Sequence, residues 1–196
     1  MSFRKWSKWV LFSIFILVVA SFPAQSCTDI VVGKNASADG SVMTCHTADG
    51  AFYDARVRTI PGKKHPAGTK ADVFWNIIME EDYEPKKIGE IPQVEETYTY
   101  FHVGYPFMNE HGVAIGETTI GQKDELKTFR PDAKAIMTIE QLEVFALQRA
   151  KTAREAIKVI GELGEKYGFL PAEVRENALQ LQILKRHGSL RFEARE

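Results

Sequence analysis

The sequence predicts a layered α+β domain, and two features of the chain support that prediction. Short runs of β-branched and aromatic residues, separated by turn formers, fill the stretch from residue 27 to residue 121, a pattern typical of strands. After Pro131 the apolar residues recur at helical spacing behind capping residues. Strands followed by a pair of helices predict sheet and helix layers around one core.

The expected strands follow one another with short turns between them. We place them at residues 27–32, 41–47, 54–60, 73–79, 97–103, 107–109 and 113–121. If the first two pair through the turn at residues 34–40, Cys27 lies opposite Cys45 or His46, and Asp49 follows one short step beyond. Between residues 107 and 121, Gly112 is expected to supply the positive φ of a hairpin turn.

Two helices are expected after the strands. Thr138 with Gln141, and Thr152 with Glu155, each have the spacing of a capping box. Gly168 is expected to end the second helix. In each helix, residues at helical spacing fall on one face. In the first helix these are Leu142, Phe145, Ala146 and Arg149. In the second they are Ala156, Ile157, Ile160, Leu163 and Tyr167.

Composition excludes several classes of protein. The chain has 196 residues, is 44% apolar and has a formal net charge of -1, which suits one globular domain. The balanced charge gives no reason to expect a nucleic-acid partner. Two cysteines exclude a disulfide-dense scaffold, and the five histidines show no paired metal-ligand spacing. We therefore expect neither a metal nor a cofactor.

The N-terminus has the three-part layout of a cleavable signal peptide at residues 1–26. Basic residues precede an apolar run at residues 9–22, and Ala24 and Ser26 occupy the positions that a signal peptidase reads. The run is shorter than the ~20 residues that span a bilayer. We expect an exported protein, periplasmic or extracellular, without a stable membrane anchor after cleavage. An uncut anchor and a lipidated Cys27 are the alternatives.

Cleavage after Ser26 would make Cys27 the first residue of the mature protein. Its thiol and a free α-amine would then lie on one residue. Because a terminal amine has a pKa near 7.7–8.0, it can act at neutral pH as the general base for its own side chain. The alternative is that Cys27 forms a disulfide with Cys45 in an oxidising compartment.

Three blocks in order resemble the secreted dipeptidases of peptidase family C69, which are N-terminal nucleophile hydrolases. They are CTDIVVGKNASADGS at residues 27–41, MNEHGVAIGETTIG at residues 108–121, and residues 146–168, which contain LQRAKTAREAIKVIGELGEKYG. The resemblance covers residues 27–168 and implies the N-terminal part of an αββα sandwich. It also implies hydrolysis of the amide bond of short peptides.

The resemblance further implies roles for single residues. Cys27 would be the nucleophile, and Asp49 would orient the α-ammonium or the substrate. His46 stands where many relatives have arginine, so it is either a substrate residue or a packed strand residue, since histidine lacks the bidentate fork of arginine. Thr118 aligns with a strand that contributes an oxyanion group. Asn109 is a further candidate near the substrate, or it serves the turn.

The tail at residues 169–196 departs from the family. The next family block, with I-A-D-P-x-E-x-W, is absent, but permissible codons read two nucleotides on give ISASGSEGECLTIADPKEAWVLEV. We therefore expect an out-of-frame tail, visible in the nucleotide sequence past Gly168. The apolar set between Ala178 and Leu184 could form a local helix or strand, yet nothing earlier in the chain looks matched to receive it. We expect the 196-residue product to be poorly soluble and inactive.

Two other function classes stay open. One is an N-acyl amide hydrolase of the same fold, which a substrate panel would separate from a dipeptidase. The other is a non-catalytic exported fragment or lipoprotein, which N-terminal sequencing and thiol labelling would identify. The side-chain preference and the oligomeric state do not follow from the sequence.

Overall fold

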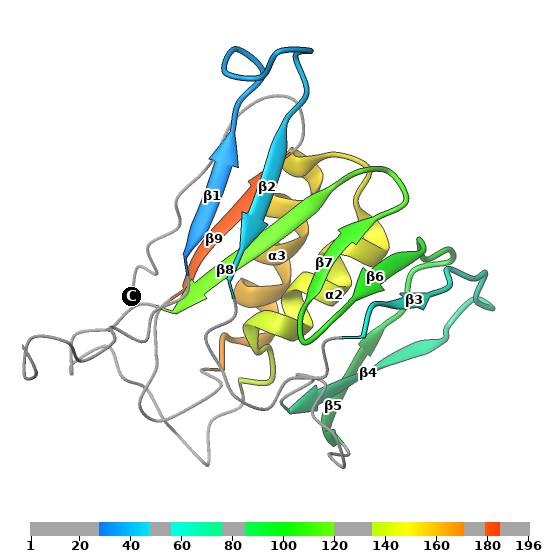
Figure 1. Ribbon diagram of the computed structural model, residues 1–196. Helices are drawn as coiled ribbons and strands as arrows, with labels where there is room; N and C mark the ends of the chain where they lie inside the picture. Colours follow the sequence, from blue (N-terminus) through cyan, green and yellow to red (C-terminus); the bar gives the residue numbers. More distant parts are fainter. Residues whose placement is uncertain (1–27, 48–55, 76–84, 120–134, 171–178, 185–196) are drawn as a thin grey trace, which may run out of the picture.

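The computed structural model describes residues 28–47, 56–75, 85–119, 135–170 and 179–184. These residues form antiparallel strands in three sheets and two helices, a mixed α/β architecture that agrees with the predicted class (Figure 1). In this part of the chain no helix is long and apolar enough to cross a membrane.

The first two strands form a hairpin. β1 (Asp29–Val32) and β2 (Met43–His46) pair antiparallel, and the turn between them is closed where Asp39 Oδ1 accepts from the Ser41 amide at 2.9 Å. Asp29 lies opposite His46 and Ile30 opposite Cys45. This register differs by two to three residues from the one that would place Cys27 opposite Cys45 or His46, because the connection continues past the turn that we assumed, up to the start of β2. Cys27 itself lies outside the described residues.

A five-stranded antiparallel sheet forms the centre of the molecule. Its order is β3-β6-β7-β8-β9, and its members are β3 (Arg58–Ile60), β6 (Tyr100–His102), β7 (Pro106–Asn109), β8 (Ala114–Thr119) and β9 (Leu179–Leu184). The predicted turn between β7 and β8 is confirmed. Gly112 has a φ of 70°, and its amide donates to the Asn109 carbonyl at 2.9 Å.

The strand β9 corrects an expectation about the tail. It pairs with β8 over six residues, from Ala114 opposite Leu184 to Thr119 opposite Leu179. The preceding chain therefore does offer a partner. Without β9, the edge of β8 would present unpaired backbone groups, and an extended segment of suitable length can pair with them.

A separate hairpin contains a strand that we did not predict. β4 (Lys70–Trp75) pairs with β5 (Lys86–Pro92), whose sequence KKIGEIP lacks a strand pattern. Between the two strands, Lys87 Nζ lies 2.7 Å from Asp72 Oδ1 and Lys70 Nζ lies 3.0 Å from Glu90 Oε2. Cross-strand charge pairs therefore help to hold a segment with weak strand propensity.

Both predicted helices and their caps are confirmed. α2 (Ile139–Arg149) begins after Thr138, whose side chain accepts from the Gln141 amide. α3 (Ala153–Tyr167) begins with the full Thr152–Glu155 capping box and ends at Gly168, which has a φ of 74°. These helix caps depend on hydrogen bonds and backbone angles between nearby residues, so they can be identified from the sequence alone.

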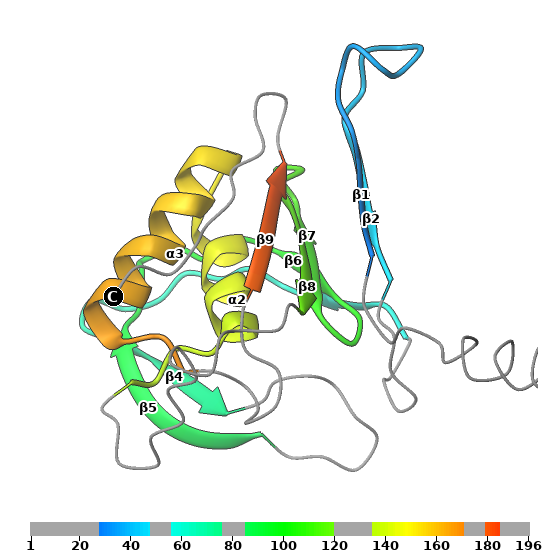
Figure 2. The same cartoon turned by 90° about the vertical axis from the view of Figure 1, so that its left-hand side faces the viewer.

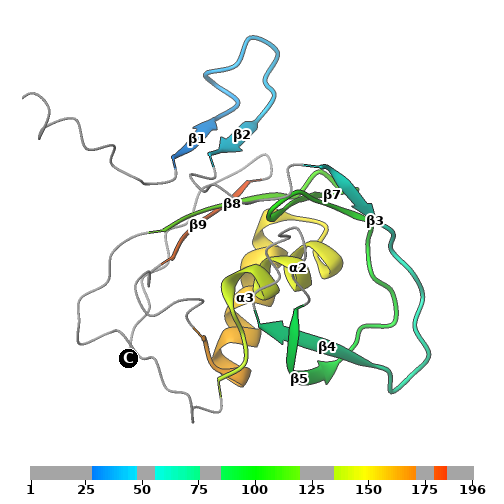
Figure 3. The ribbon, with the colours of Figure 1, turned by 60° about the horizontal axis from the view of Figure 1, so that its bottom comes forward.

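The elements stack in layers. Figure 2 shows α2 and α3 on one face of the five-stranded sheet and the β1–β2 hairpin on the other. Figure 3 shows the β4–β5 hairpin closing the far side of α2. α2 is thus covered by the sheet, by α3 and by that hairpin, and nine of its eleven residues are buried. The apolar core forms around it, with Val73, Ile91, Val113, Ile115, Phe145 and Leu147 among its most buried members.

One glycine is fixed by a close backbone approach. A Cβ at Gly62 would overlap the carbonyl oxygen of Thr97 and lie 2.7 Å from the amide nitrogen of Thr99. We expect Gly62→Ala to lower the free energy of unfolding by about 1–3 kcal/mol, as overpacking does. Gly33→Ala is the matched control, since a Cβ there would meet nothing within 4 Å. Equal denaturant midpoints for both variants would contradict this packing.

Candidate functional site

Two of the predicted site residues, Cys27 and Asp49, lie outside the described residues. Their described neighbours are Thr28 and Thr47, which face each other at the end of the β1–β2 hairpin. The Thr47 amide donates to the Thr28 carbonyl at 3.0 Å, and the Thr28 amide donates to Thr47 Oγ1 at 3.0 Å. In the sequence, Cys27 comes just before this end of the hairpin and Asp49 comes two residues after it.

At the same end, the hairpin contacts the central sheet through two polar side chains. Asp29 and His46 are cross-strand partners. A Cβ built on Gly116 of β8 would lie 3.4 Å from Asp29 Oδ1 and 3.5 Å from His46 Nδ1. Because Gly116 has no side chain, Asp29 and His46 can both lie close to its backbone. His46 also meets Tyr105 edge-on, with ring centroids 6.1 Å apart.

Asp29 has an unusual environment for a carboxylate. Neither of its side-chain oxygens is accessible, and neither has a hydrogen-bond partner within the described residues. Burial raises the pKa of this carboxyl above its usual value, and the nearby His46 partly offsets that effect. An acceptor of this kind is suited to receive a donor or a positive charge.

Beneath the same strand lies a group of three glutamates. Glu117 belongs to β8, and Glu140 and Glu143 belong to α2. Burial, followed by repulsion from Glu140 and Asp29, raises the pKa of Glu117 to about 8. Burial also raises the pKa values of Glu140 and Glu143. At neutral pH Glu117 therefore favours its protonated form, because ionisation would place a negative charge in a buried site beside other carboxyl groups.

The side-chain amide of Asn109 is fully engaged in hydrogen bonds to backbone groups. Its Nδ2 donates to the carbonyls of Leu147 and Ala150, each at 2.8 Å, and its Oδ1 accepts from the amides of His111 and Val113, each at 3.1 Å. The amide thus uses two donors and two acceptor sites to join the β7–β8 turn to the end of α2. We do not include Asn109 in the proposed chemistry.

The remaining predicted positions are placed by the strands. Thr118 lies in β8 opposite Gln180. Cys45 lies in β2 and is a free, exposed thiol in the described structure. Within the described ranges, no three His, Cys, Asp or Glu side chains are arranged to hold a metal ion.

Comparison with known proteins identifies the family. Residues 26–177 match the model of Peptidase family C69. The chain belongs to this family. The match begins one residue before Cys27 and includes β1 to β8 and both helices.

A curated relative agrees with the C69 assignment. It is named "Probable dipeptidase", from Salmonella dublin, and is 25% identical over 171 residues. The match covers 82% of this chain and 37% of the relative. The chain therefore spans a little over a third of the length of this relative.

The structure of this C69 member adds residues that sequence reasoning missed. Asp29 could have been noticed as a lone carboxylate in a β-branched strand, two residues after Cys27. Glu140 and Glu143 gave no signal, because a glutamate in a helix is usually solvated. Only the position of α2 between three layers reveals that they are buried.

Proposed function

We propose that this chain is the N-terminal part of a cysteine dipeptidase that uses Cys27 as an N-terminal nucleophile. The observation that supports this most strongly is the family match, which starts at the boundary between the leader and Cys27. The name of the curated relative supports a dipeptide substrate. The described layers are compatible with an αββα sandwich, and the second sheet and outer helix layer belong to the proposal.

In the proposed reaction a single residue, Cys27, supplies both the nucleophile and the general base. The free α-amine of Cys27 takes the thiol proton, and the thiolate attacks the carbonyl carbon of the peptide bond. The leaving amine receives the proton, and a thioester remains on sulfur. Water then attacks the thioester and releases the acyl group.

The described residues would support this chemistry from the floor of the site. Asp29 and His46 lie together over Gly116 at the hairpin end that leads to Cys27. The unpartnered carboxylate of Asp29 is suited to accept from an ammonium or amide N–H. Asp49 and Thr118 keep the roles that the resemblance implies, orientation of the α-ammonium or substrate and oxyanion binding.

Processing provides the first test. We expect the exported protein to begin at unmodified Cys27, because the mechanism requires a free α-amine. Intact-mass analysis of the protein from the producing cell should give the mass of residues 27–196. A retained leader, or a mass increment from acylation of Cys27, would refute the mechanism.

Activity is best measured in two forms of the gene. We propose that residues 169–196 are read out of frame, so the frame-restored gene is expected to give the active dipeptidase. A panel of dipeptides and N-acyl amino acids identifies the substrate class. Hydrolysis of N-acyl amino acids alone would favour the related amide hydrolase instead.

A further inference from the structure

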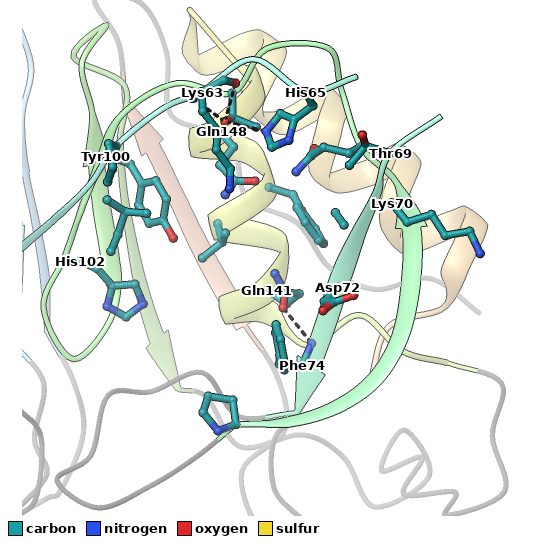
Figure 4. A pocket seen from close by; sticks show the side chains of 18 of the residues that line it. Lys63, His65, Thr69, Lys70, Asp72, Phe74, Tyr100, His102, Gln141 and Gln148 are labelled. Atoms are coloured by element: carbon teal, nitrogen blue, oxygen red, sulfur yellow. Dashed lines mark hydrogen bonds between the residues drawn. The ribbon is translucent and has the colours of Figure 1, made fainter. Parts of the chain in front are cut away.

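A second site candidate lies on the opposite face of the central sheet from Asp29 and His46. It is a cavity of about 730 Å³ between α2, the β4–β5 hairpin and strands β3 and β6. Figure 4 shows its labelled side chains converging from these elements. Nothing in the proposed hydrolysis uses it.

One part of the cavity wall is apolar. α2 contributes Val144 and Phe145, and Ile60, Ala71 and Phe74 face them from the strands. Gln141 is fixed in this wall, since its Oε1 accepts from the Phe74 amide at 3.0 Å. A cavity that combines an apolar wall with fixed polar groups can hold a small molecule.

Two buried acceptors in the lining have no hydrogen-bond partner in the described part of the chain. They are His102 Nδ1 and Gln148 Oε1. His102 is 2% exposed, and burial together with the nearby Arg58 lowers its pKa to about 4. The ring is therefore neutral at pH 7, and one of its nitrogens can accept a hydrogen bond. A ligand with hydrogen-bond donors would satisfy both acceptors.

The rim of the cavity has an excess of positive charge. Arg58, Lys63 and Lys70 line it, against the single acid Asp72. Lys70 and Asp72 already form ion pairs within the β4–β5 hairpin, with Glu90 at 3.0 Å and with Lys87 at 2.7 Å. Lys63 and Gln148 come near each other through their backbones, because the Thr97 amide donates to the Lys63 carbonyl at 3.0 Å and the next amide, that of Tyr98, donates to the Gln148 carbonyl at 2.9 Å. A carboxylate is the group complementary to Lys63.

We propose that this cavity binds a small 2-amino or 2-hydroxy acid with an apolar side chain. Its carboxylate pairs with Lys63, its adjacent N–H or O–H donates to Gln148 Oε1, and its side chain lies along Val144 and Phe145. A carboxylate and a donor on neighbouring carbons match a cation and an acceptor on two lining residues whose backbones are joined through Thr97 and Tyr98. This inference goes beyond the proposed hydrolysis and does not require it.

Binding to the full chain tests the proposal with four probes, measured by calorimetry. L-phenylalanine and L-3-phenyllactate have both groups, 3-phenylpropionate lacks the donor, and phenethylamine lacks the carboxylate. We expect at least one of the first two to bind 10-fold or more tightly than either of the last two. If no probe binds, or if all four bind equally, the proposal is wrong.

Variants locate the site. Lys63→Gln should weaken binding of the preferred acid about 10-fold, and Val144→Trp should abolish it by filling the cavity. Lys63 is exposed and its ordered contacts are made by its backbone, so Lys63→Gln should fold even if Val144→Trp does not. Lys158→Gln, at an exposed position of α3, is the control and should bind normally. Unchanged binding by folded Lys63→Gln would overturn the assignment. Cys27→Ser should bind normally, which separates this result from the fate of the proposed hydrolysis.

Discussion

Cys27→Ser should lower the rate of dipeptide hydrolysis by the frame-restored protein on the order of 10³-fold or more, as loss of a catalytic nucleophile does. The α-amine remains in this variant, but a hydroxyl is far harder to deprotonate than a thiol. The loss should therefore appear mainly in kcat rather than in KM. Steady-state kinetics with the preferred dipeptide measures the effect.

Cys45→Ser is the matched control, since Cys45 is the other cysteine of the chain and is free and exposed in β2. We expect it to keep nearly full activity. A thiol-specific reagent should likewise inactivate the parent protein and the Cys45→Ser variant at similar rates. Equal losses of activity from both substitutions would instead support a disulfide between the two cysteines.

Glu143→Gln should stabilise the protein at neutral and mildly basic pH. Glu143 is 1% exposed, and neither carboxylate oxygen has a hydrogen-bond partner in the described structure. A carboxyl whose pKa is raised by folding binds more protons in the folded than in the unfolded state. Its contribution therefore makes the free energy of unfolding fall as pH rises through this range. For Glu117 the range runs from the usual value of 4.5 to about 8.

The side-chain amide that this substitution introduces cannot ionise, so the variant should lose part of this pH dependence. We expect a gain of about 1–3 kcal/mol at pH 8, which is the usual penalty for a buried polar group without a partner, and little change at pH 4. Urea unfolding at the two pH values measures it. Glu162→Gln on the exposed face of α3 is the control. A parallel shift of both variants, or a gain at pH 4 alone, would refute the raised pKa.

The sequence predicted the features that depend on neighbouring residues. Thr138, Thr152 and Gly168 set the helix ends through hydrogen bonds or backbone angles within one turn. Gly112 set the β7–β8 turn in the same way. Such devices act over three or four residues, so their patterns are visible in the chain itself.

Features that depend on tertiary contacts were missed. β5 has two lysines, a glutamate, a glycine and a terminal proline, and it is a strand because β4 offers it backbone and charged partners. Glu140 and Glu143 lie outside the apolar face that we expected for the first helix. They are buried because α2 is enclosed on more than one side, which no periodicity can show. The same limit applies to Asp29 and His46, which meet over Gly116 only in the folded layers.

The position of the β1–β2 hairpin also bears on the order of folding. The hairpin contacts the rest of the described structure chiefly through β8, which lies far along the sequence. The β6–β7–β8 meander and the α2–α3 pair join segments that are close in sequence. Contacts between distant segments cost more loop-closure entropy and tend to form later. We expect the hairpin to dock last, so that the proposed Cys27 site would be completed only after the core beneath the hairpin has formed.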